Sequence, residues 1–476
     1  MYGRNKSSVG KNCLINQRRD IMNKKKIDLF SAILLLINLV FYLFFALYDG
    51  AIICVDSPSY INMDSSREPL YPMLLLLFRN LLGESNYLFW IAVFQSILAA
   101  LAAYTLVNYL RKTIDISKLC TLCLAAMPFA VSILCRFVAK RGSMYSNSIL
   151  TEGVTISLYM IFLRFILEYY FTQSKKSFWW CIILILVQIS VRKQMLISLA
   201  LFVTLILVLC LKKKTVLRGM WVIIGCTLFI LGMNKIIDIG YNYVVHGEVL
   251  THTGDIRFVS TIAFYTSERQ HGANIKNEEI RGLFYEIYDA CDANGYLKHS
   301  AGEGWLERVS HFGDYYDCIQ IDTMWPMINT YVVDKYGYDG VAISEKADEI
   351  MGTISKAIIP KNIDDVIGVF FDNFISGLIT TVAQRNRILT WYSLVIYSVY
   401  ILLLITNLRN NKDSKVNAIA VITLLSIVYN VGLVSVVIFC QTRYTVYNMA
   451  MFYVSLILLL HAVFVKMWGK KILRKG

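Results

Sequence analysis

Ten apolar segments divide this sequence, and they constrain its fold more than any other feature. A membrane-spanning helix needs about 20 mostly apolar residues. The expected spans are 29–48, 87–110, 119–135, 153–171, 178–191, 194–211, 220–237, 391–408, 416–440 and 444–465. Hydrophobic residues make up 57% of the chain and charged residues 17%, whereas a soluble protein has about 25% charged residues. The sequence therefore predicts an all-α polytopic membrane protein with about ten transmembrane helices.

Three segments depart from the simple pattern of one apolar run per span. Residues 178–211 are too long for one helix and contain Arg192-Lys193, so they predict two spans that meet at a basic turn. The apolar stretch 70–82 is too short to cross a bilayer and predicts a helix that lies at the interface or re-enters the membrane. Residues 362–382 carry apolar side chains at helical spacing, which indicates an amphipathic helix leading into the eighth span.

Basic residues gather in short clusters at alternate ends of these spans. The net charge of +14 could suggest a nucleic-acid partner, but its distribution is typical of membrane topology, in which cytoplasmic loops are rich in Lys and Arg. The clusters lie at 1–28, 111–118, 175–176, 212–218, 409–415 and 466–475. We therefore expect a multi-pass protein of the plasma (cytoplasmic) membrane with both termini cytoplasmic, a lipid bilayer around it, and no nucleic-acid partner.

This topology divides the chain into four parts. They are a cytoplasmic basic tail at 1–28, a transmembrane module at 29–239 whose first external loop is 49–86, a mixed external segment at 240–389 between the seventh and eighth helices, and C-terminal helices with a basic tail at 390–476. In the external segment, Asn277 followed by two acidic residues predicts a helix start. Cys291 and Cys318 could pair if this segment is extracytoplasmic, or remain free.

A few cations lie on the predicted external side, where the topology rule disfavours them. They are Arg136, Lys140, Arg141, Arg192, Lys193 and Arg443. Arg and Lys are the usual partners of phosphate groups, so the group as a whole indicates an anion site. The alternative for each residue is that its side chain extends to the lipid headgroups.

The loop 55–72 is the strongest candidate for chemistry. It is polar, contains half of the six prolines and begins with Asp56 just after the first span. Ionisable residues at such a depth are functional candidates. We expect the low-dielectric surroundings to raise the pKa of Asp56, which makes a carboxylate a better base. The alternative is that Asp56 only stabilises a turn, because Asp-Ser-Pro-Ser is also a good turn sequence.

The order of these residues resembles a known family. Asp56-Ser57-x-x-Tyr60 followed by Arg67-x-Pro69-Leu70-Tyr71-Pro72 is similar to the first external loop of GT-C membrane glycosyltransferases. The likeness is greatest to the branch with the lipid A aminoarabinose transferase and the protein O-mannosyltransferases. The further matches are Glu152 at the mouth of the fourth span, Arg192 between two short spans, Ala357–Pro360 before an amphipathic helix, and Arg443-Tyr444 opening the last span.

The resemblance implies an inverting transfer of a sugar from a polyprenyl-phosphate donor to a glycan, lipid or protein acceptor on the external face. Asp56 would be the general base, and Glu152 or Asp64 could supply a second acid, because Ser57 stands where relatives commonly have Glu. We expect Asp56 and Glu152 to be catalytic. The residues expected to bind substrate are Tyr60, Arg67, Lys140, Arg141, Arg192, Lys193, Arg443 and Tyr444.

The sequence names no certain cofactor. Some relatives use a divalent metal ion, but five of the six histidines lie at 246–311 with loose spacing. We expect these histidines to be solvent-exposed rather than ligands, and whether a divalent metal ion binds stays open.

Two other functions compete with sugar transfer. A transporter or flippase for a lipid-linked or anionic solute would explain the external cations, but broken helices in paired positions or inverted repeats are expected of it. A polysaccharide polymerase or ligase would also use external arginines and polyprenyl-linked substrates, and it would not need Asp56. Separate substitutions of Asp56 and Arg443 distinguish these classes, because a base-driven transferase needs both residues.

Overall fold

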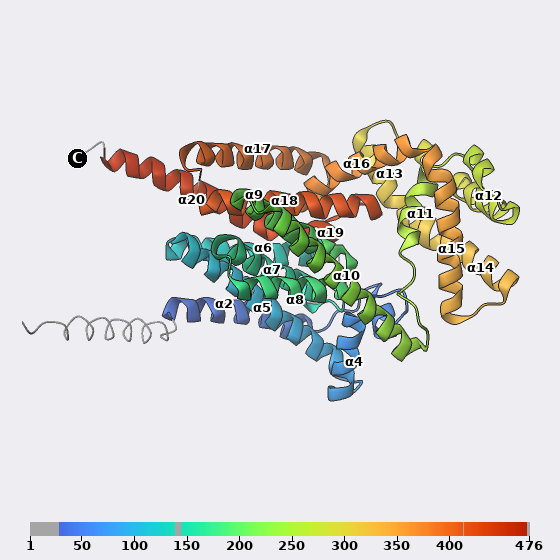
Figure 1. Ribbon diagram of the computed structural model, residues 1–476, viewed down its shortest axis with the longest axis horizontal. Coiled ribbons are helices and arrows are strands. Elements are labelled where there is room, and N and C mark those ends of the chain that lie inside the picture. Colours follow the sequence, from blue (N-terminus) through green and yellow to red (C-terminus); the bar gives the residue numbers. More distant parts are fainter. Residues whose placement is uncertain (1–27, 139–143, 413, 474–476) are drawn as a thin grey trace, which may run out of the picture.

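The protein is an all-α polytopic membrane protein, and this architecture confirms the predicted fold class. The computed structural model describes residues 28–138, 144–412 and 414–473 (Figure 1). Within these ranges the only β-type pairing is one isolated parallel bridge between Ile52 and Ser148. The predicted basic tail at 1–28 lies outside the described residues except for Asp28, which caps the first helix by accepting a hydrogen bond from the Phe30 N–H.

The bundle is built from two groups of helices. The N-terminal group is α2 (Leu29–Asp49), α4 (Leu70–Leu82), α5 (Tyr87–Ile114), α6 (Lys118–Val138), α7 (Glu152–Thr172), α8 (Lys175–Val191), α9 (Leu196–Lys213) and α10 (Val216–His246). The C-terminal group is α17 (Arg387–Asn410), α18 (Lys415–Val437) and α20 (Met449–Leu473). Their shared core brings α7, α9, α18 and α20 together. Helices α10 and α17 bury little of their apolar surface and lie at the periphery of the bundle.

Among the described residues, ten helices are long and apolar enough to cross a membrane. Nine of them coincide with predicted spans, and the tenth is α16 (Ile363–Val382). Helix α8 is absent from this set because it has only 17 residues, which is about 26 Å at 1.5 Å per residue. The prediction had assigned a span to α8 and an interfacial position to α16. Four apolar side chains one turn apart on α16 remain exposed, namely Ile363, Ile367, Phe371 and Ile375.

Helices α8 and α9 form the predicted hairpin with a basic turn. Arg192 has an extended backbone, with φ −161° and ψ 120°, which ends α8. A short 3-10 turn, Lys193–Met195, then leads into α9. The hairpin packs against α7 and α10. It therefore carries the Arg192-Lys193 turn to the end of the bundle where α7 begins.

The two ends of the bundle differ in what they contain. The start of α2 and the C-terminal end of α20 lie at one end (Figure 1). At the opposite end lie the loop 50–69, the 192–195 turn, the helices that follow α10, and α19 (Thr442–Thr445). We call this opposite end the loop end. Its segments are the ones that the charge pattern assigned together to the external side.

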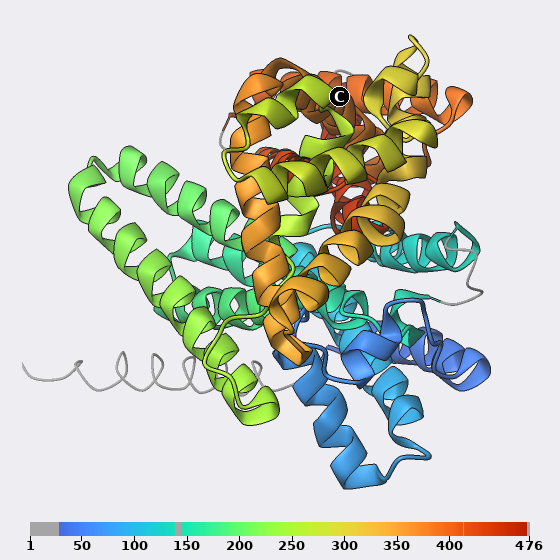
Figure 2. The same ribbon diagram turned by 90° about the vertical axis from the view of Figure 1, so that its right-hand side faces the viewer.

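The segment between α10 and α17 folds into helices with a core of their own (Figure 2). Besides α16 it contains α11 (Ile256–Tyr265), α12 (Glu278–Ala293), α13 (Trp305–Asp317), the π-helix η5 (Cys318–Met324), α14 (Trp325–Tyr336) and α15 (Gly340–Ile358). Asn277 caps α12 by accepting hydrogen bonds from the backbone N–H groups of Glu279 and Ile280, which confirms the predicted helix start. Cys291 and Cys318 are both free thiols.

Candidate active site

The loop that carries Asp56 is fastened to the connection between α6 and α7. The Ser57 hydroxyl donates to the Ile149 carbonyl at 2.8 Å and accepts from the Cys54 N–H at 2.7 Å. Ser57 begins a short helix, α3 (Ser57–Ile61), with Pro58 in its first turn. Together with the Ile52–Ser148 bridge, these contacts set Asp56 beside the start of α7. Asp56 stands at the N-cap of α3, but its side chain makes no capping hydrogen bond. The turn is therefore held by Ser57 rather than by the Asp56 carboxylate.

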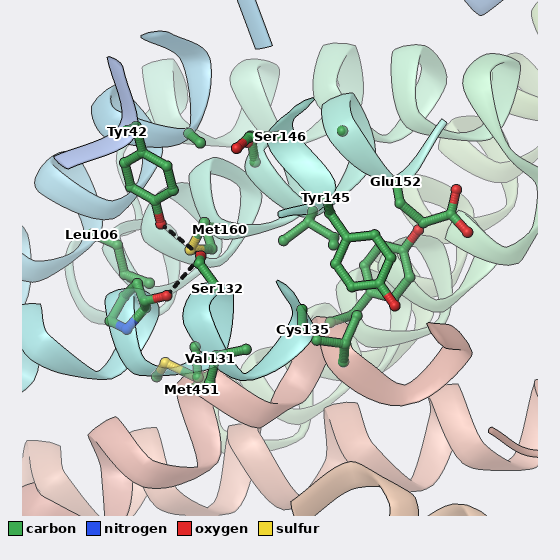
Figure 3. Close-up of a pocket in the computed structure, with 18 of the residues that line it drawn as sticks. Tyr42, Leu106, Val131, Ser132, Cys135, Tyr145, Ser146, Glu152, Met160 and Met451 are labelled. Atoms are coloured by element: carbon green, nitrogen blue, oxygen red, sulfur yellow. Dashed lines mark hydrogen bonds between the residues drawn. The ribbon is translucent and has the colours of Figure 1, made fainter. Parts of the chain in front are cut away.

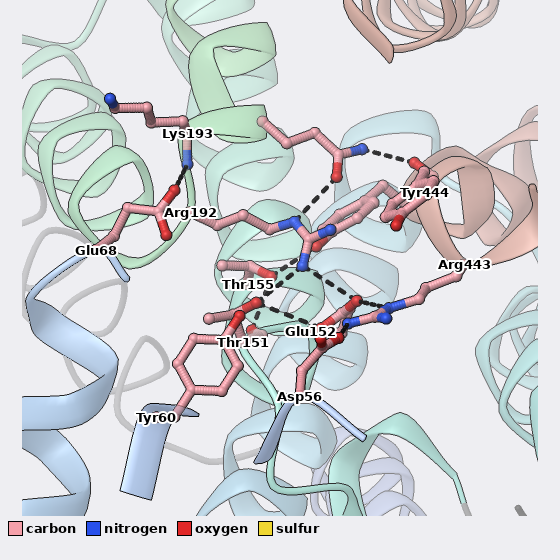
Figure 4. A network of polar contacts seen from close by, with 12 residues as sticks. Asp56, Tyr60, Glu68, Thr151, Glu152, Thr155, Arg192, Lys193, Arg443 and Tyr444 are labelled. Atoms are coloured by element: carbon pink, nitrogen blue, oxygen red, sulfur yellow. Dashed lines mark hydrogen bonds and ion pairs between the residues drawn. The ribbon is translucent and has the colours of Figure 1, made fainter. Parts of the chain in front are cut away.

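Asp56 belongs to an ion-pair network that joins four distant segments of the chain (Figure 4). Arg443 donates from Nη2 to Asp56 Oδ2 at 2.7 Å, and its Nε binds Glu152. Arg192 approaches the same Glu152 oxygen at 3.1 Å, and Arg67 approaches Asp56 at 3.3 Å. Charged side chains thus join four segments, namely the first loop, the start of α7, the α8–α9 turn and α19. We call these five residues the charged network.

Within the charged network the two acids differ in accessibility. The Glu152 side chain is completely buried, whereas that of Asp56 is 29% exposed. Breaking a buried ion pair is costly, because the remaining charge is uncompensated, and Glu152 has two guanidinium partners. Asp56 can reach a molecule that enters from the loop end, and Glu152 cannot do so without a rearrangement. Three guanidinium groups against two carboxylates leave one positive charge in excess.

The pKa of Asp56 is lowered, so the expectation that it is raised was wrong. Burial alone would raise the pKa of this carboxyl group, but the positive charges of Arg443 and Arg67 outweigh burial. The pKa of the Arg192 guanidinium is correspondingly raised, because Glu152 outweighs the effect of burial. Asp56 is therefore ionised at neutral pH and ready to accept a proton. Its basicity stays modest while both arginines contact it.

The predicted aromatic residues pack against the arginines of the network. The guanidinium of Arg67 lies 4.6 Å from the centre of the Tyr60 ring. Tyr444 lies beside two arginines. The centre of its ring is 5.6 Å from the Arg192 guanidinium and 5.8 Å from the Arg443 guanidinium. Such cation–π contacts stabilise an arginine and fix its direction. Both tyrosines therefore orient the cations.

Other predicted cations lie apart from the charged network. The Lys193 ammonium pairs with Asp255 and points away from Glu152, while the Lys193 backbone N–H donates to Glu68 at 2.9 Å (Figure 4). Arg136 makes a two-pronged ion pair with Asp49, at 2.8 and 3.0 Å. Lys140 and Arg141 lie outside the described residues. Of the six external cations that indicated an anion site, the described chain thus keeps Arg192 and Arg443 in the charged network, and Arg67 joins them there.

The two candidates for the second acid differ in their contacts. Asp64 accepts a hydrogen bond from the Ser66 N–H at 2.8 Å, which is a local turn contact. Glu152 contacts two arginines of the charged network. Glu152 therefore shares one cation, Arg443, with Asp56.

Three neutral residues hold the network in place and were not predicted. Gln194 accepts from Arg192 Nε at 3.0 Å and donates to the Asn430 side chain at 2.8 Å. It also donates to the Tyr444 carbonyl at 2.6 Å. The Thr151 hydroxyl accepts from Arg192 at 2.9 Å. An amide side chain inside an apolar segment is costly unless it is hydrogen-bonded. The presence of Asn430 in a predicted span was therefore the sequence signal that could have indicated a polar contact there.

A cavity of about 50 Å³ lies inside the bundle beside the charged network (Figure 3). Helices α2, α5, α6, α7 and α20 surround it. Its walls are mostly apolar, with Leu106, Val131 and Met451 among them, and Glu152 lies at one end. The Tyr42 and Ser132 hydroxyls form a hydrogen bond of 3.2 Å on the opposite side. The cavity therefore joins an apolar interior to the buried acid.

No metal centre is evident in the described ranges 28–138, 144–412 and 414–473, which contain no group of three or more His, Cys, Asp or Glu side chains placed to hold an ion. His252 is nevertheless buried, so the expectation that it is solvent-exposed was wrong. Its Nδ1 lies 2.6 Å from Asp238 Oδ2, and its Nε2 lies 3.3 Å from Asp255 Oδ1. Through Asp255 and Lys193, this histidine links the end of α10 to the α8–α9 turn.

This link has a predictable pH dependence. Burial lowers the pKa of His252, but its bonds to Asp238 and Asp255 outweigh burial and raise the pKa from 6.5 to about 10. A raised pKa means that the stabilisation is fully present below pH 6.5 and is lost progressively as the pH rises through about 10. The difference in melting temperature between wild type and His252→Gln should therefore shrink from pH 6.5 to pH 10. A difference that stays constant over this interval would contradict the assignment.

Comparison of the chain with protein-family models, with curated proteins and with solved structures finds no match. The resemblance to GT-C glycosyltransferases therefore stays a prediction from the residues quoted above. The fold and the charged network define a polytopic membrane protein with a partly buried, net cationic site at the loop end of its helix bundle.

Proposed function

We propose that this protein is a membrane glycosyltransferase that moves a sugar from a polyprenyl-phosphate donor to an acceptor hydroxyl or amino group. The observation that carries the proposal is the convergence of Asp56, Glu152 and three arginines from four distant segments. These are the residues for which the sequence resembles GT-C enzymes. An accessible carboxylate beside several guanidinium groups suits the removal of a proton next to a phosphate leaving group.

In the proposed reaction, the acceptor attacks the anomeric carbon from the face opposite the phosphate. A new bond forms between the acceptor atom and the sugar, and the bond between the sugar and the phosphate oxygen breaks. The proton of the acceptor goes to the Asp56 carboxylate, and polyprenyl phosphate leaves with its electron pair. Arg443 and its neighbours stabilise the charge that develops on the phosphate.

The donor itself would make Asp56 a better base. A phosphate that binds Arg443 competes with Asp56 for the same guanidinium, which contacts Asp56 Oδ2 at 2.7 Å. Loss of that contact removes the largest influence that lowers the pKa of Asp56. Base strength and donor occupancy would then rise together.

We further propose that the loop end is external and that both termini are cytoplasmic, in a plasma membrane. The support is the charge asymmetry. The helix ends opposite the charged network carry basic residues, as expected of cytoplasmic flanks. They include Lys112, Lys176, Lys213 and Arg409.

Substituting an arginine of the charged network tests donor recognition. Arg443→Ala should weaken binding of fluorescent polyprenyl phosphate to the purified full-length protein by about ten- to a hundred-fold, because a hydrogen bond to a charged group contributes about 1.5–3 kcal/mol. Arg443→Lys should recover part of the affinity. Arg136→Ala is the matched control, since Arg136 pairs with Asp49 outside the network. Unchanged affinity in Arg443→Ala would refute the phosphate site.

The two alternative functions give different results in the same preparation. A transporter or flippase would move the labelled donor across a liposome membrane and would not transfer its sugar. A polymerase or ligase would retain activity when Asp56 is replaced, because it has no need of this base. A transferase loses activity in both the Asp56 and the Arg443 variants.

A further inference from the structure

Arg257, in the first turn of α11, is a partly buried cation without an acidic partner. Its guanidinium makes no hydrogen bond or ion pair with any residue of the described ranges, and its Nε atom is buried without a hydrogen-bond partner. An arginine carries five N–H donors, and a buried polar atom without a partner calls for a bound water, ion or ligand. Arg257 is therefore a candidate for binding a group that accepts hydrogen bonds.

Two aromatic rings hold the Arg257 side chain. Its guanidinium lies 5.2 Å from the centre of the Phe258 ring and 5.4 Å from the Trp325 ring at the start of α14. Such contacts stabilise a cation and leave the N–H groups at the edge of its plane free to donate. The cation is thus oriented before any ligand binds.

The same side chain stands beside the loop of the charged network. Gly254 has φ +90°, and a side chain added there would lie 3.5 Å from the Arg257 guanidinium carbon and 3.6 Å from the Ser66 β-carbon. Ser66 directly precedes the loop arginine of the charged network. The Thr253 N–H donates to the Ser65 carbonyl at 3.1 Å, which fastens the two segments together. Arg257 therefore adds a positive charge next to the network.

The acids near Arg257 are engaged elsewhere. Asp348 accepts from a backbone N–H at 2.6 Å, and Asp64 accepts from another at 2.8 Å. Asp255 pairs with Lys193. Burial lowers the pKa of the Arg257 guanidinium, and the positive charge of the loop arginine lowers it further. A bound anion would offset both effects.

We propose that Arg257 binds an anionic group, a phosphate or a carboxylate, that is carried by the acceptor. This inference rests on the proposed function. The charged network has one positive charge in excess, which the phosphate of one donor neutralises, so Arg257 is available for a second anion. Helix α11 belongs to the segment that lies beyond the loop end of the bundle (Figure 1), whereas a lipid-linked phosphate stays at the membrane surface. Arg257 thus stands on the side from which an acceptor arrives.

Calorimetry tests the second anion site with the purified full-length protein saturated with polyprenyl phosphate, which occupies the charged network. The probes are methyl phosphate and methyl glucuronide, which are anionic, and methyl glucoside, which is neutral. The wild type should bind at least one anionic probe at least about ten times more tightly than methyl glucoside, as expected of one charge-assisted hydrogen bond. Arg257→Gln should lose this preference and should bind polyprenyl phosphate as the wild type does.

Two further variants separate recognition from folding. Arg257→Lys keeps the charge and should keep part of the preference. Arg385→Gln is the matched control, because Arg385 is also partly buried and has no acidic partner in the described chain, and it should bind the probes as the wild type does. The anionic probe should raise the melting midpoint of the wild type and not that of Arg257→Gln, since a ligand stabilises only the protein that binds it.

Each other result has a definite meaning. Equal binding of the anionic probe by the wild type and Arg257→Gln, or no preference in the wild type, would overturn this inference and leave the proposed function standing. Weaker binding of polyprenyl phosphate by Arg257→Gln would assign Arg257 to the donor and would also overturn it. Unchanged affinity of Arg443→Ala for polyprenyl phosphate would refute the proposed function, and with it the acceptor role, even if Arg257 binds the anionic probe.

Discussion

Replacing Asp56 by Asn should lower sugar transfer by about 10²–10⁴-fold, the usual contribution of general-base catalysis. Asn is nearly isosteric with Asp and keeps an acceptor oxygen for Arg443, but it cannot take up a proton at neutral pH. The Asp56 carboxylate is the accessible acid of the charged network, so no second acid can replace it without movement. Transfer is measured with purified enzyme, and binding of polyprenyl phosphate is measured beside it.

Asp64→Asn is the matched control for this experiment. Asp64 lies in the same loop, and its carboxylate accepts from the Ser66 N–H, a role that Asn also fills. We expect near-normal turnover in Asp64→Asn and retained binding of polyprenyl phosphate in Asp56→Asn. If Asp56→Asn keeps normal turnover, Asp56 acts only in the turn, and the proposed mechanism is wrong.

The second large effect concerns stability. Glu152→Gln should destabilise the protein by about 3–5 kcal/mol, the usual result of removing one partner from a buried ion pair. The completely buried Glu152 carboxylate pairs with both Arg192 and Arg443. Gln leaves Arg192 without a counter-charge and leaves Arg443 with Asp56 alone. The measurement is the thermal unfolding midpoint in detergent. Added polyprenyl phosphate should raise that midpoint more in Glu152→Gln than in wild type, because the phosphate supplies the missing negative charge.

An exposed ion pair at the other end of α7 is the control for Glu152→Gln. Glu168 pairs with Arg164 four residues earlier at 2.9 Å, and both side chains are partly exposed. Such pairs contribute about 0.3–0.5 kcal/mol, so Glu168→Gln should melt close to wild type. Equal melting of Glu152→Gln and wild type would show that the buried charges of the network are compensated in another way.

The fold was largely predictable because the sequence signals were local. Segment length and apolarity predict nine of the ten candidate spans, and the short apolar stretch 70–82 gives α4 with the same bounds. Which of α8 and α16 is long enough to span the membrane was not predictable. Their lengths, 17 and 20 residues, lie on either side of the length that a span needs. Hydrophobic patterning alone cannot separate such cases.

The site was predictable in its residue types and not in its contacts. External cations stand out against the topology rule, which identified Arg192 and Arg443. The lowered pKa of Asp56 depends on Arg443, which lies in a segment near the other end of the sequence, and no local pattern specifies that pairing. Gln194 and Asn430 were missed for a similar reason, since neutral amides become informative only when their partners are known.

The position of Arg443 has a consequence for how the protein is made. A chain is synthesised from its N-terminus, and its earlier parts fold first. Glu152 can meet Arg192 as soon as the α8–α9 hairpin is inserted, but Arg443 lies just before α20 and is synthesised long after both residues. The residue that joins the two acids is thus the last to arrive. A nascent chain that has not reached Arg443 therefore holds Asp56 and its loop without the cation that completes the charged network.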